Sequence, residues 1–269
     1  MASIRTVTIQ RWKPKTRETL DDIVVREVGL RMILSDSIGE ENFAFVRTIP
    51  APPSPLIYGL LYTSRIINAL EDVVHLRVSN QLAKVRITDE CGIHEKLDSL
   101  RPTARLVTGV CGPEGALGTW RACDLPPIDS PLIIQPDTLL KAIKALNKSM
   151  PIYQQTGGTH GAALADIMGG LHIVAEDVGR HNAIDRVIGK ALQKGKDCST
   201  SLLLCTGRLT GDLVLKAAVA RIPYLASIGA AVDTGVELAE AAGITLIGFV
   251  RGTRMNIYAH PERISFNGA

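Results

Sequence analysis

The chain has 269 residues, of which 46% are apolar, and 30 basic against 27 acidic residues give it a formal net charge of +3. This length and composition suffice to bury one large hydrophobic core or two modest ones. The small positive excess argues against a nucleic-acid or membrane binder, whereas a small anionic ligand remains compatible with it.

The first residues, Met1 to Thr6, run directly into an alternating segment and lack the ordered regions of a secretory signal. No apolar run reaches membrane-spanning length. The five cysteines include no pair separated by two residues, which argues against a disulfide framework and for a reducing compartment. We therefore expect a cytoplasmic protein.

Short β-like runs dominate the first half of the chain. Three prolines precede an apolar helical pattern, and Ser79-Asn80 separates two runs typical of a hairpin. In chain order the predicted elements are strands at 4–10, within Asp22 to Leu34 and at 43–49, a buried helix from Leu56 to Ile66, and a hairpin of 71–77 with 82–88.

A glycine-rich segment from Gly109 to Gly118 contains one thiol, Cys111. Its composition favours an exposed, mobile loop, where a thiol could accept and donate sulfur. Arg101 and Arg105 lie upstream and could favour the thiolate. A lone cysteine is more often a buried packing residue, so both interpretations stay open.

The run Pro126 to Pro131 interrupts the chain, and the segments beyond it are longer and more regularly apolar. We place a domain boundary here. Residues 1–128 are predicted to form a smaller, mixed and β-rich N-terminal domain that carries the reactive-cysteine loop. Residues 129–269 are predicted to form a cofactor-binding α/β domain.

In the second half, strand and helix patterns alternate, which predicts right-handed crossovers and a largely parallel sheet covered on both faces. The overall fold class is α/β, or α+β for the whole chain. The predicted elements are a helix from Asp137 to Met150, a hairpin of 160–167 with 171–176, a helix from about Arg180, strands at Ser201–Cys205, Ile222–Ala226 and Ile244–Val250, and helices at Asp212–Ala220 and Gly235–Ala242.

Three strand ends are candidates for ligand contact, because ligands of open α/β sheets bind beyond the carboxyl ends of the strands. Ordinary turns and helix caps would explain the first two, Thr206–Asp212 and Ser227–Thr234. The third, Phe249–Asn256, has Arg251 and Arg254 around a glycine. Since guanidinium groups match phosphate geometry bidentately, this loop is the best anion site.

Two polar clusters have both a functional and a structural interpretation. His181 and Asp185 lie one helical turn apart and could do acid–base chemistry, but a hydrogen-bonded network at the strand-to-helix turn is favoured. His160 suggests a zinc ligand of a nucleobase deaminase, yet residue 162 is Ala162 and the chain has no C-x-x-C pair. We therefore predict no metal site.

Three segments resemble the formate dehydrogenase accessory sulfurtransferase family, often called FdhD. They are Gly157–Leu164, Glu176–Asp185 and Ile244–Gly252, and the second is the most specific. Weaker similarity at Val24–Leu34 and Thr48–Ile67 extends the resemblance to nearly the whole chain.

The resemblance implies a protein that receives persulfide sulfur from a cysteine desulfurase and passes it to the molybdenum cofactor, in its bis-guanine-dinucleotide form, before insertion into formate dehydrogenase. It also implies a homodimer and a C-terminal domain with the cytidine-deaminase-like fold without its zinc. The segment matched to cofactor binding comprises Phe249, Val250, Arg251, Gly252, Thr253 and Arg254.

The family commonly carries a C-x-x-C pair within a C-G-x-C-G pattern, but here Thr108 replaces the first cysteine and only Cys111 remains. One thiol suffices for a persulfide carrier, although a two-thiol relay within this loop is excluded. The hypotheses are a sulfur carrier with Cys111 as catalytic residue, a chaperone that binds the cofactor without sulfur chemistry, and a zinc-dependent deaminase-like hydrolase.

Overall fold

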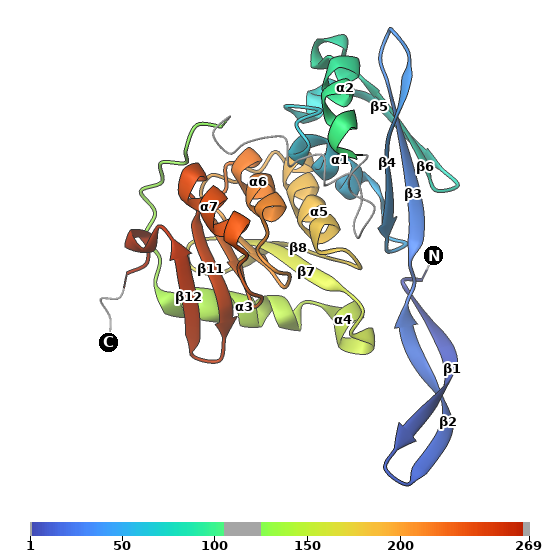
Figure 1. The fold of residues 1–269 in the computed structure, drawn as a ribbon, viewed down its shortest axis with the longest axis vertical. Helices are drawn as coiled ribbons and strands as arrows, with labels where there is room; N and C mark the ends of the chain where they lie inside the picture. Colours follow the sequence, from blue (N-terminus) through green and yellow to red (C-terminus); the bar gives the residue numbers. More distant parts are fainter. Residues whose placement is uncertain (1, 105–124, 266–269) are drawn as a thin grey trace.

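A computed structural model describes residues 2–104 and 125–265 of the chain. In helix α2 (Ile93–Ala104) the side chains are described only up to Asp98. In these ranges the strands form three sheets of two, four and six strands (Figure 1). The fold is a mixed α/β architecture, as the sequence predicts. Cys111 lies outside the described residues.

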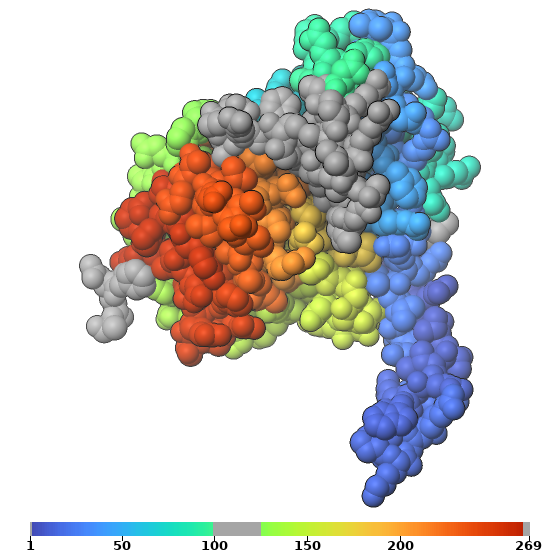
Figure 2. Space-filling view, in the orientation of Figure 1, coloured from blue at the N-terminus to red at the C-terminus, as the bar shows by residue number. Residues whose placement is uncertain are grey.

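The two-stranded sheet is an antiparallel hairpin of β1 (Ile4–Lys13) and β2 (Thr16–Val25) that projects from the body as an arm (Figure 1 and, in blue, Figure 2). The predicted strand at 4–10 is therefore confirmed, but it is longer than expected. The predicted run from Asp22 to Leu34 is split, because Val25 ends β2 in the arm and Val28 begins β3 in the next sheet.

The four-stranded sheet has the order β4-β3-β6-β5, and one of its faces is buried. Its elements are β3 (Val28–Ser35), β4 (Glu40–Thr48), β5 (Val73–Ser79) and β6 (Leu82–Ile87), with helices α1 (Ser54–Thr63) and α2 (Ile93–Ala104). Inward side chains of these strands form one core with both helices. The predicted strand at 43–49, the helix at 56–66 and the hairpin are confirmed. Helix α2, with few apolar residues, was not predicted.

The six-stranded sheet has the order β12-β11-β10-β9-β7-β8. Its strands are β7 (His160–Ala165), β8 (Leu171–Asp177), β9 (Leu202–Cys205), β10 (Tyr224–Ser227), β11 (Thr245–Arg251) and β12 (Arg254–Ala259). The helices are α3 (Pro136–Lys148), α4 (Pro151–Thr156), α5 (Arg180–Gln193), α6 (Gly211–Val219) and α7 (Asp233–Ala242). Short 3₁₀ turns occupy Leu70–Asp72, Asp89–Cys91 and Pro261–Arg263.

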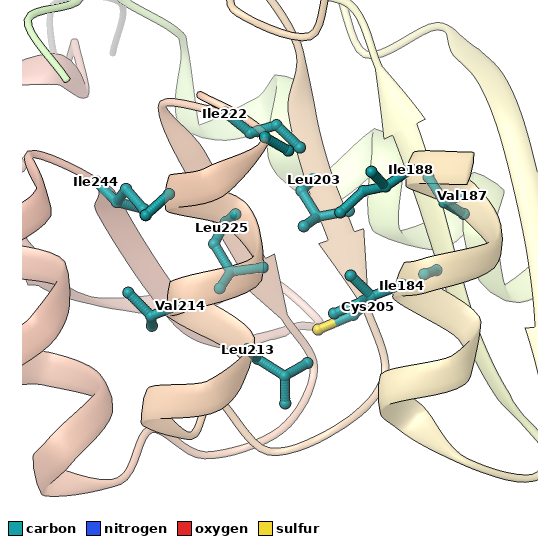
Figure 3. Close-up of a cluster of buried hydrophobic side chains, with 14 of the residues drawn as sticks. Ile184, Val187, Ile188, Leu203, Cys205, Leu213, Val214, Ile222, Leu225 and Ile244 are labelled. Atoms are coloured by element: carbon teal, nitrogen blue, oxygen red, sulfur yellow. The ribbon is translucent and has the colours of Figure 1, made fainter. Parts of the chain in front are cut away.

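Alternating side chains of this sheet fill two separate cores. Leu203 and Leu225 point toward α5, α6 and α7, where they meet residues such as Ile184 and Val214 (Figure 3). Leu202 and Leu204 point the other way, into the core that contains α3. The prediction of a sheet covered on both faces is thus confirmed.

The prediction of a largely parallel sheet is wrong. Only β9, β10 and β11 run parallel, whereas β7 pairs antiparallel with both β8 and β9, and β12 pairs antiparallel with β11. The reason is local: Arg251 and Arg254 flank a two-residue turn in which Gly252 has a φ of 62°, so the chain folds back into β12. The predicted helix to Met150 likewise ends at Lys148, before Pro151 begins α4.

The two larger sheets are joined by direct backbone contact between α1 and α5. A Cβ atom built on Gly59 would overlap the carbonyl oxygen of Asp185, and one built on Gly189 would overlap that of Pro55. Only glycine allows helices to approach so closely. The two halves therefore pack as one body at this crossing.

Buried ion pairs surround the same crossing. The ammonium of Lys216 donates to both carboxylate oxygens of Asp185 at 2.9 Å, and the Thr63 hydroxyl donates to one of them at 2.7 Å. The Lys216 and Asp185 side chains are fully buried. This satisfied network matches the structural interpretation of Asp185 over the acid–base one.

Candidate functional site

The carboxyl ends of the parallel strands meet the beginning of β7 at one edge of the six-stranded sheet. The Thr206 hydroxyl, just after β9, accepts a hydrogen bond from the amide of Gly161 at 3.1 Å and lies 3.2 Å from Nδ1 of His160. In the next connection, the Ser227 hydroxyl donates to the carbonyl of Gly207 at 2.5 Å. These bonds hold three connections side by side.

Glycine is required where these connections cross. A Cβ on Gly229 would lie 2.6 Å from the carbonyl oxygen of Gly207, and one on Gly207 would lie 2.7 Å from the side chain of Arg180. Gly229 also accepts a backbone hydrogen bond from Phe249 at 2.9 Å. The edge is therefore a close-packed backbone surface, of the kind that lets a ligand approach main-chain amides.

A cavity of about 560 Å³ opens beside this edge. Its wall combines apolar and polar side chains with glycine backbone: Asn147, Met150, Tyr153, Gly157, Gly158, Thr159, His160, Val178, Thr206 and Ile228. A concave pocket with a few polar groups is the usual form of a small-molecule site. The sequence identified His160 and Thr206, but no signal singled out Asn147 or Tyr153, which come from α3 and α4.

The imidazole of His160 is a neutral group in this wall. Burial, together with the positive charge of Arg180 and the nearby His181, lowers the pKa of His160 below its ordinary value. At neutral pH it therefore acts as a hydrogen-bonding ring and not as a cation. In the described ranges no cluster of three or more histidine, cysteine or acidic side chains could hold a metal ion.

The predicted anion site at Phe249–Asn256 is the turn of the β11–β12 hairpin, and not a loop. Arg251 and Arg254 are directly opposite in the register, and both are exposed. Two like charges facing each other repel, and an anion placed between them would relieve that repulsion. Thr253 is exposed as well, whereas Val250 is fully buried and can offer a ligand only its backbone.

Phe249 shapes this turn through an unusual backbone conformation. It has a φ of 51°, which coincides with a register irregularity between Gly248 and Arg251. The Arg251 guanidinium lies 5.1 Å from the centre of its ring, a cation–π contact that holds the arginine beside the strand end. Phe249 and Arg251 thus form one positioned group.

Two polar atoms near the edge are buried without a hydrogen-bond partner among the described residues. They are Nε of Arg180 and Oγ1 of Thr210. Thr210 is the N-cap residue of α6, yet its side chain caps no amide. In the following connection the predicted side-chain cap is not formed: the N-cap residue of α7 is Val232, and Asp233, the first residue of the helix, accepts only from the amide of its neighbour Thr234. In the Thr206–Asp212 segment, the hydroxyl of Thr210 is a buried polar group that an ordinary turn or cap does not explain.

The carboxylates of the most specific motif are structural. Glu176 accepts hydrogen bonds from the amides of Ile152 and Tyr153, at 3.0 and 2.8 Å, and so anchors the start of α4 beside the cavity. Asp177 accepts from Arg186 at 2.7 Å and from Thr48 at 2.5 Å, which ties the end of β8 to the N-terminal half. Neither group is free for chemistry.

The three described cysteines are poor nucleophiles. Cys91 and Cys205 are buried, and burial raises the pKa of both thiols. Cys198 is half-buried, and burial raises its pKa to about 11. Because the thiolate is the reactive form, none of these three suits sulfur transfer at neutral pH. Cys111 and Cys123, which complete the five, lie outside the described residues.

Comparison with known proteins gives a consistent result. Residues 25–265 match the family model described as the FdhD/NarQ family. The chain is 35% identical to "Sulfur carrier protein FdhD" of Thermoplasma acidophilum over 92% of this chain and 88% of that protein. It is 33% identical to the protein of the same name from Sulfolobus acidocaldarius, over 97% and 98% of the two chains.

A solved structure shows the same fold. The crystal structure of a putative formate dehydrogenase accessory protein from Desulfotalea psychrophila superposes with a TM-score of 0.76 and 25% identity. The alignment covers 98% of this chain and 100% of that chain. Within the described ranges, no helix combines the length and apolar character needed to cross a membrane.

Proposed function

Because the chain belongs to the FdhD/NarQ family, we propose that it is a sulfur carrier that serves the maturation of formate dehydrogenase. Its cargo is the molybdenum cofactor in the bis-guanine-dinucleotide form, its sulfur donor is a cysteine desulfurase, and it acts as a cytoplasmic homodimer. The observation that carries the proposal is the exposed pair Arg251 and Arg254, directly opposite in the β11–β12 turn, in a family whose named relatives are sulfur carriers.

Cys111 is the proposed catalytic residue. Its thiolate attacks the terminal sulfur of the donor's persulfide, so that a new S–S bond forms on Cys111 while the donor's S–S bond breaks and the donor cysteine leaves as thiolate. In the second step the cofactor supplies the electron pair for a new bond to that terminal sulfur and is thereby formally oxidised by two electrons. The S–S bond on Cys111 breaks, the persulfide proton is released, and Cys111 leaves as a thiolate. The raised pKa values of Cys91, Cys198 and Cys205 count against these three thiols. Of the two that remain, Cys111 is favoured over Cys123 because it lies in the glycine-rich segment.

The guanine-dinucleotide cargo has diphosphate groups, which suit two adjacent guanidinium groups. In the proposed site Arg251 and Arg254 bind those phosphates, and Phe249 holds Arg251 in place. Gly252 and Thr253 offer exposed backbone and hydroxyl groups in the turn between them. Cargo binding is thus assigned to a site separate in sequence from the sulfur-bearing thiol.

Mass spectrometry tests the sulfur-carrier proposal. The protein is incubated with a cysteine desulfurase and cysteine, and its peptides are examined for an added sulfur atom. We expect the label on Cys111 and its loss in Cys111→Ala, while Cys198→Ala, the matched control, keeps it because that thiol is half-buried with a raised pKa. A label that survives Cys111→Ala contradicts the assignment.

A nucleotide titration tests the cargo site. Charged hydrogen bonds contribute roughly 1.5–3 kcal/mol each, so Arg251→Ala and Arg254→Ala should each weaken binding of a guanine nucleotide about 10-fold or more. Arg5→Ala, on the projecting arm, is the control and should leave affinity unchanged. Equal affinity in all three variants refutes the site.

The replacement of the usual first cysteine by Thr108 favours one alternative, a chaperone that carries the cofactor without sulfur chemistry. The two functions differ in a cell-based measurement. Loss of formate dehydrogenase activity in Cys111→Ala supports the carrier. Normal activity in that variant, combined with reduced activity in Arg251→Ala, supports the chaperone.

A further inference from the structure

The outer face of the four-stranded sheet is exposed and carries a concentration of positive charge. Along β6 the residues alternate strictly, with Ala83, Val85 and Ile87 buried and Lys84 and Arg86 exposed. The buried face meets α1, and α1 in turn meets α5, so the outer face points away from the C-terminal half (Figure 1).

The strand register places basic side chains of the neighbouring strands β5 and β6 directly opposite each other. Lys84 is directly opposite Arg77 on β5, and Arg86 is opposite His75. Neighbouring strands lie about 4.8 Å apart, so these charges are close neighbours. Lys84 has an acidic partner, Glu40 at 2.9 Å.

Several of these cations have no acidic partner among the described residues. Within the described residues, Arg77 and Arg86 show no ion pair or side-chain hydrogen bond. The Arg31 guanidinium donates to a neutral amide, that of Asn42, at 2.5 Å. Of the other cations, Lys84 pairs with Glu40 and Arg47 lies 3.8 Å from Glu27, so the patch is only partly neutralised. An external anionic surface would stabilise the positive charge that remains.

An apolar centre lies within this positive patch. The Phe45 side chain is 56% exposed, and its ring covers Gly29, where a Cβ would lie 2.5 Å from the ring. The Arg47 guanidinium sits 5.5 Å from the ring centre. An exposed aromatic ring with an arginine, rimmed by charge, is the composition of a protein–protein contact centre.

We infer that the outer face formed by Arg31, Phe45, Arg47, Arg77, Lys84 and Arg86 docks an acidic surface of a protein partner. Charge complementarity identifies the kind of partner. A protein is favoured over a nucleic acid, because sheets that bind single strands stack successive bases on several aromatic rings, whereas the residues named here include one such ring, that of Phe45.

The inference rests on the proposed function for its two binding probes, a cysteine desulfurase and the apo form of formate dehydrogenase. The affinity of the full-length chain for each is measured at low and high salt. In the triple variant Arg77→Glu/Lys84→Glu/Arg86→Glu, we expect affinity for at least one probe to fall about 10-fold or more at low salt and to lose most of its salt dependence.

The matched control is Lys141→Glu/Lys144→Glu/Lys148→Glu, which makes the same charge change at exposed positions of α3 and should keep wild-type affinity. A milder variant is Arg77→Gln/Lys84→Gln/Arg86→Gln, whose folding is checked by circular dichroism. It removes the charges without reversing them, and it should also weaken binding. Guanine-nucleotide affinity, which depends on the separate turn at Arg251 and Arg254, should be unchanged in all variants.

Wild-type affinity in the sheet variants, or an equal loss in the α3 variant, overturns the docking surface while the proposed function stands. If the unmodified chain binds neither probe, both the docking surface and the proposed function are overturned. A mixed-sequence single-stranded RNA that binds the wild type and not the sheet variants, in the absence of any protein binding, overturns the inference in favour of a nucleic-acid site.

Discussion

Lys216→Met is expected to lower the free energy of unfolding by about 3–5 kcal/mol, because it leaves a buried carboxylate without its counter-charge. The Lys216 ammonium is within 2.9 Å of both oxygens of Asp185, and both side chains are fully buried. Methionine preserves most of the side-chain volume, so the loss reports charge and not packing. Chemical denaturation, followed by circular dichroism, measures it.

The control for this prediction is Lys144→Met on the exposed side of α3, which should change stability by less than about 0.5 kcal/mol. The double variant Asp185→Leu/Lys216→Met removes both charges and should recover a large part of the loss, since a buried pair replaced by apolar residues is often neutral. If Lys216→Met is as stable as the control, the buried pair contributes nothing.

Gly59→Ala is expected to destabilise the protein by at least about 2 kcal/mol. The added methyl group would overlap the carbonyl oxygen of Asp185, a backbone atom that no side-chain rotation can move. Because the overlap is with fixed backbone, its cost belongs at the upper end of the usual range for overpacking, about 3 kcal/mol or more. Alanine gains roughly 1 kcal/mol over glycine inside a helix, which leaves a net loss of about 2 kcal/mol or more. The midpoint of urea unfolding gives the measurement.

Gly39→Ala is the matched glycine control, since a Cβ there would meet only the His94 ring at 4.0 Å. Gly189→Ala, whose methyl would overlap the Pro55 carbonyl from the opposite helix, should reproduce the loss seen in Gly59→Ala. A stability in Gly59→Ala that equals the Gly39 control would mean that α1 and α5 do not touch in solution.

Regular hydrophobic periodicity made much of the fold predictable. The apolar stripe of Ile184, Val187 and Ile188 on α5 is buried against the sheet, as its helical spacing indicates. Helix α2 escaped prediction because only a few of its residues are apolar. The antiparallel strand β12 was not predicted because its arginine and asparagine suggest a loop, while the turn at Gly252 is set by backbone conformation.

The candidate site could be predicted only where its residues are neighbours in sequence. Arg251 and Arg254 were chosen from their spacing around a glycine, and the hairpin places them directly opposite each other. That they bind an anion remains a prediction. The cavity was not predictable, since Asn147, Tyr153 and Thr206 come from three separate elements and meet only through tertiary packing. Lys216 gave no signal either, because its partner Asp185 lies 31 residues away in sequence.

The helix crossing at Gly59 and Gly189 also fixes the distance between surface points on the two halves of the molecule. Because backbone touches backbone there, a hinge motion of one half against the other would have to tear apart this contact and the ion pair beside it. Arg77 on one half and Arg251 on the other are thus held at a fixed separation. We therefore expect a partner docked at the proposed surface to lie at a constant distance from a cargo bound at the proposed arginine pair.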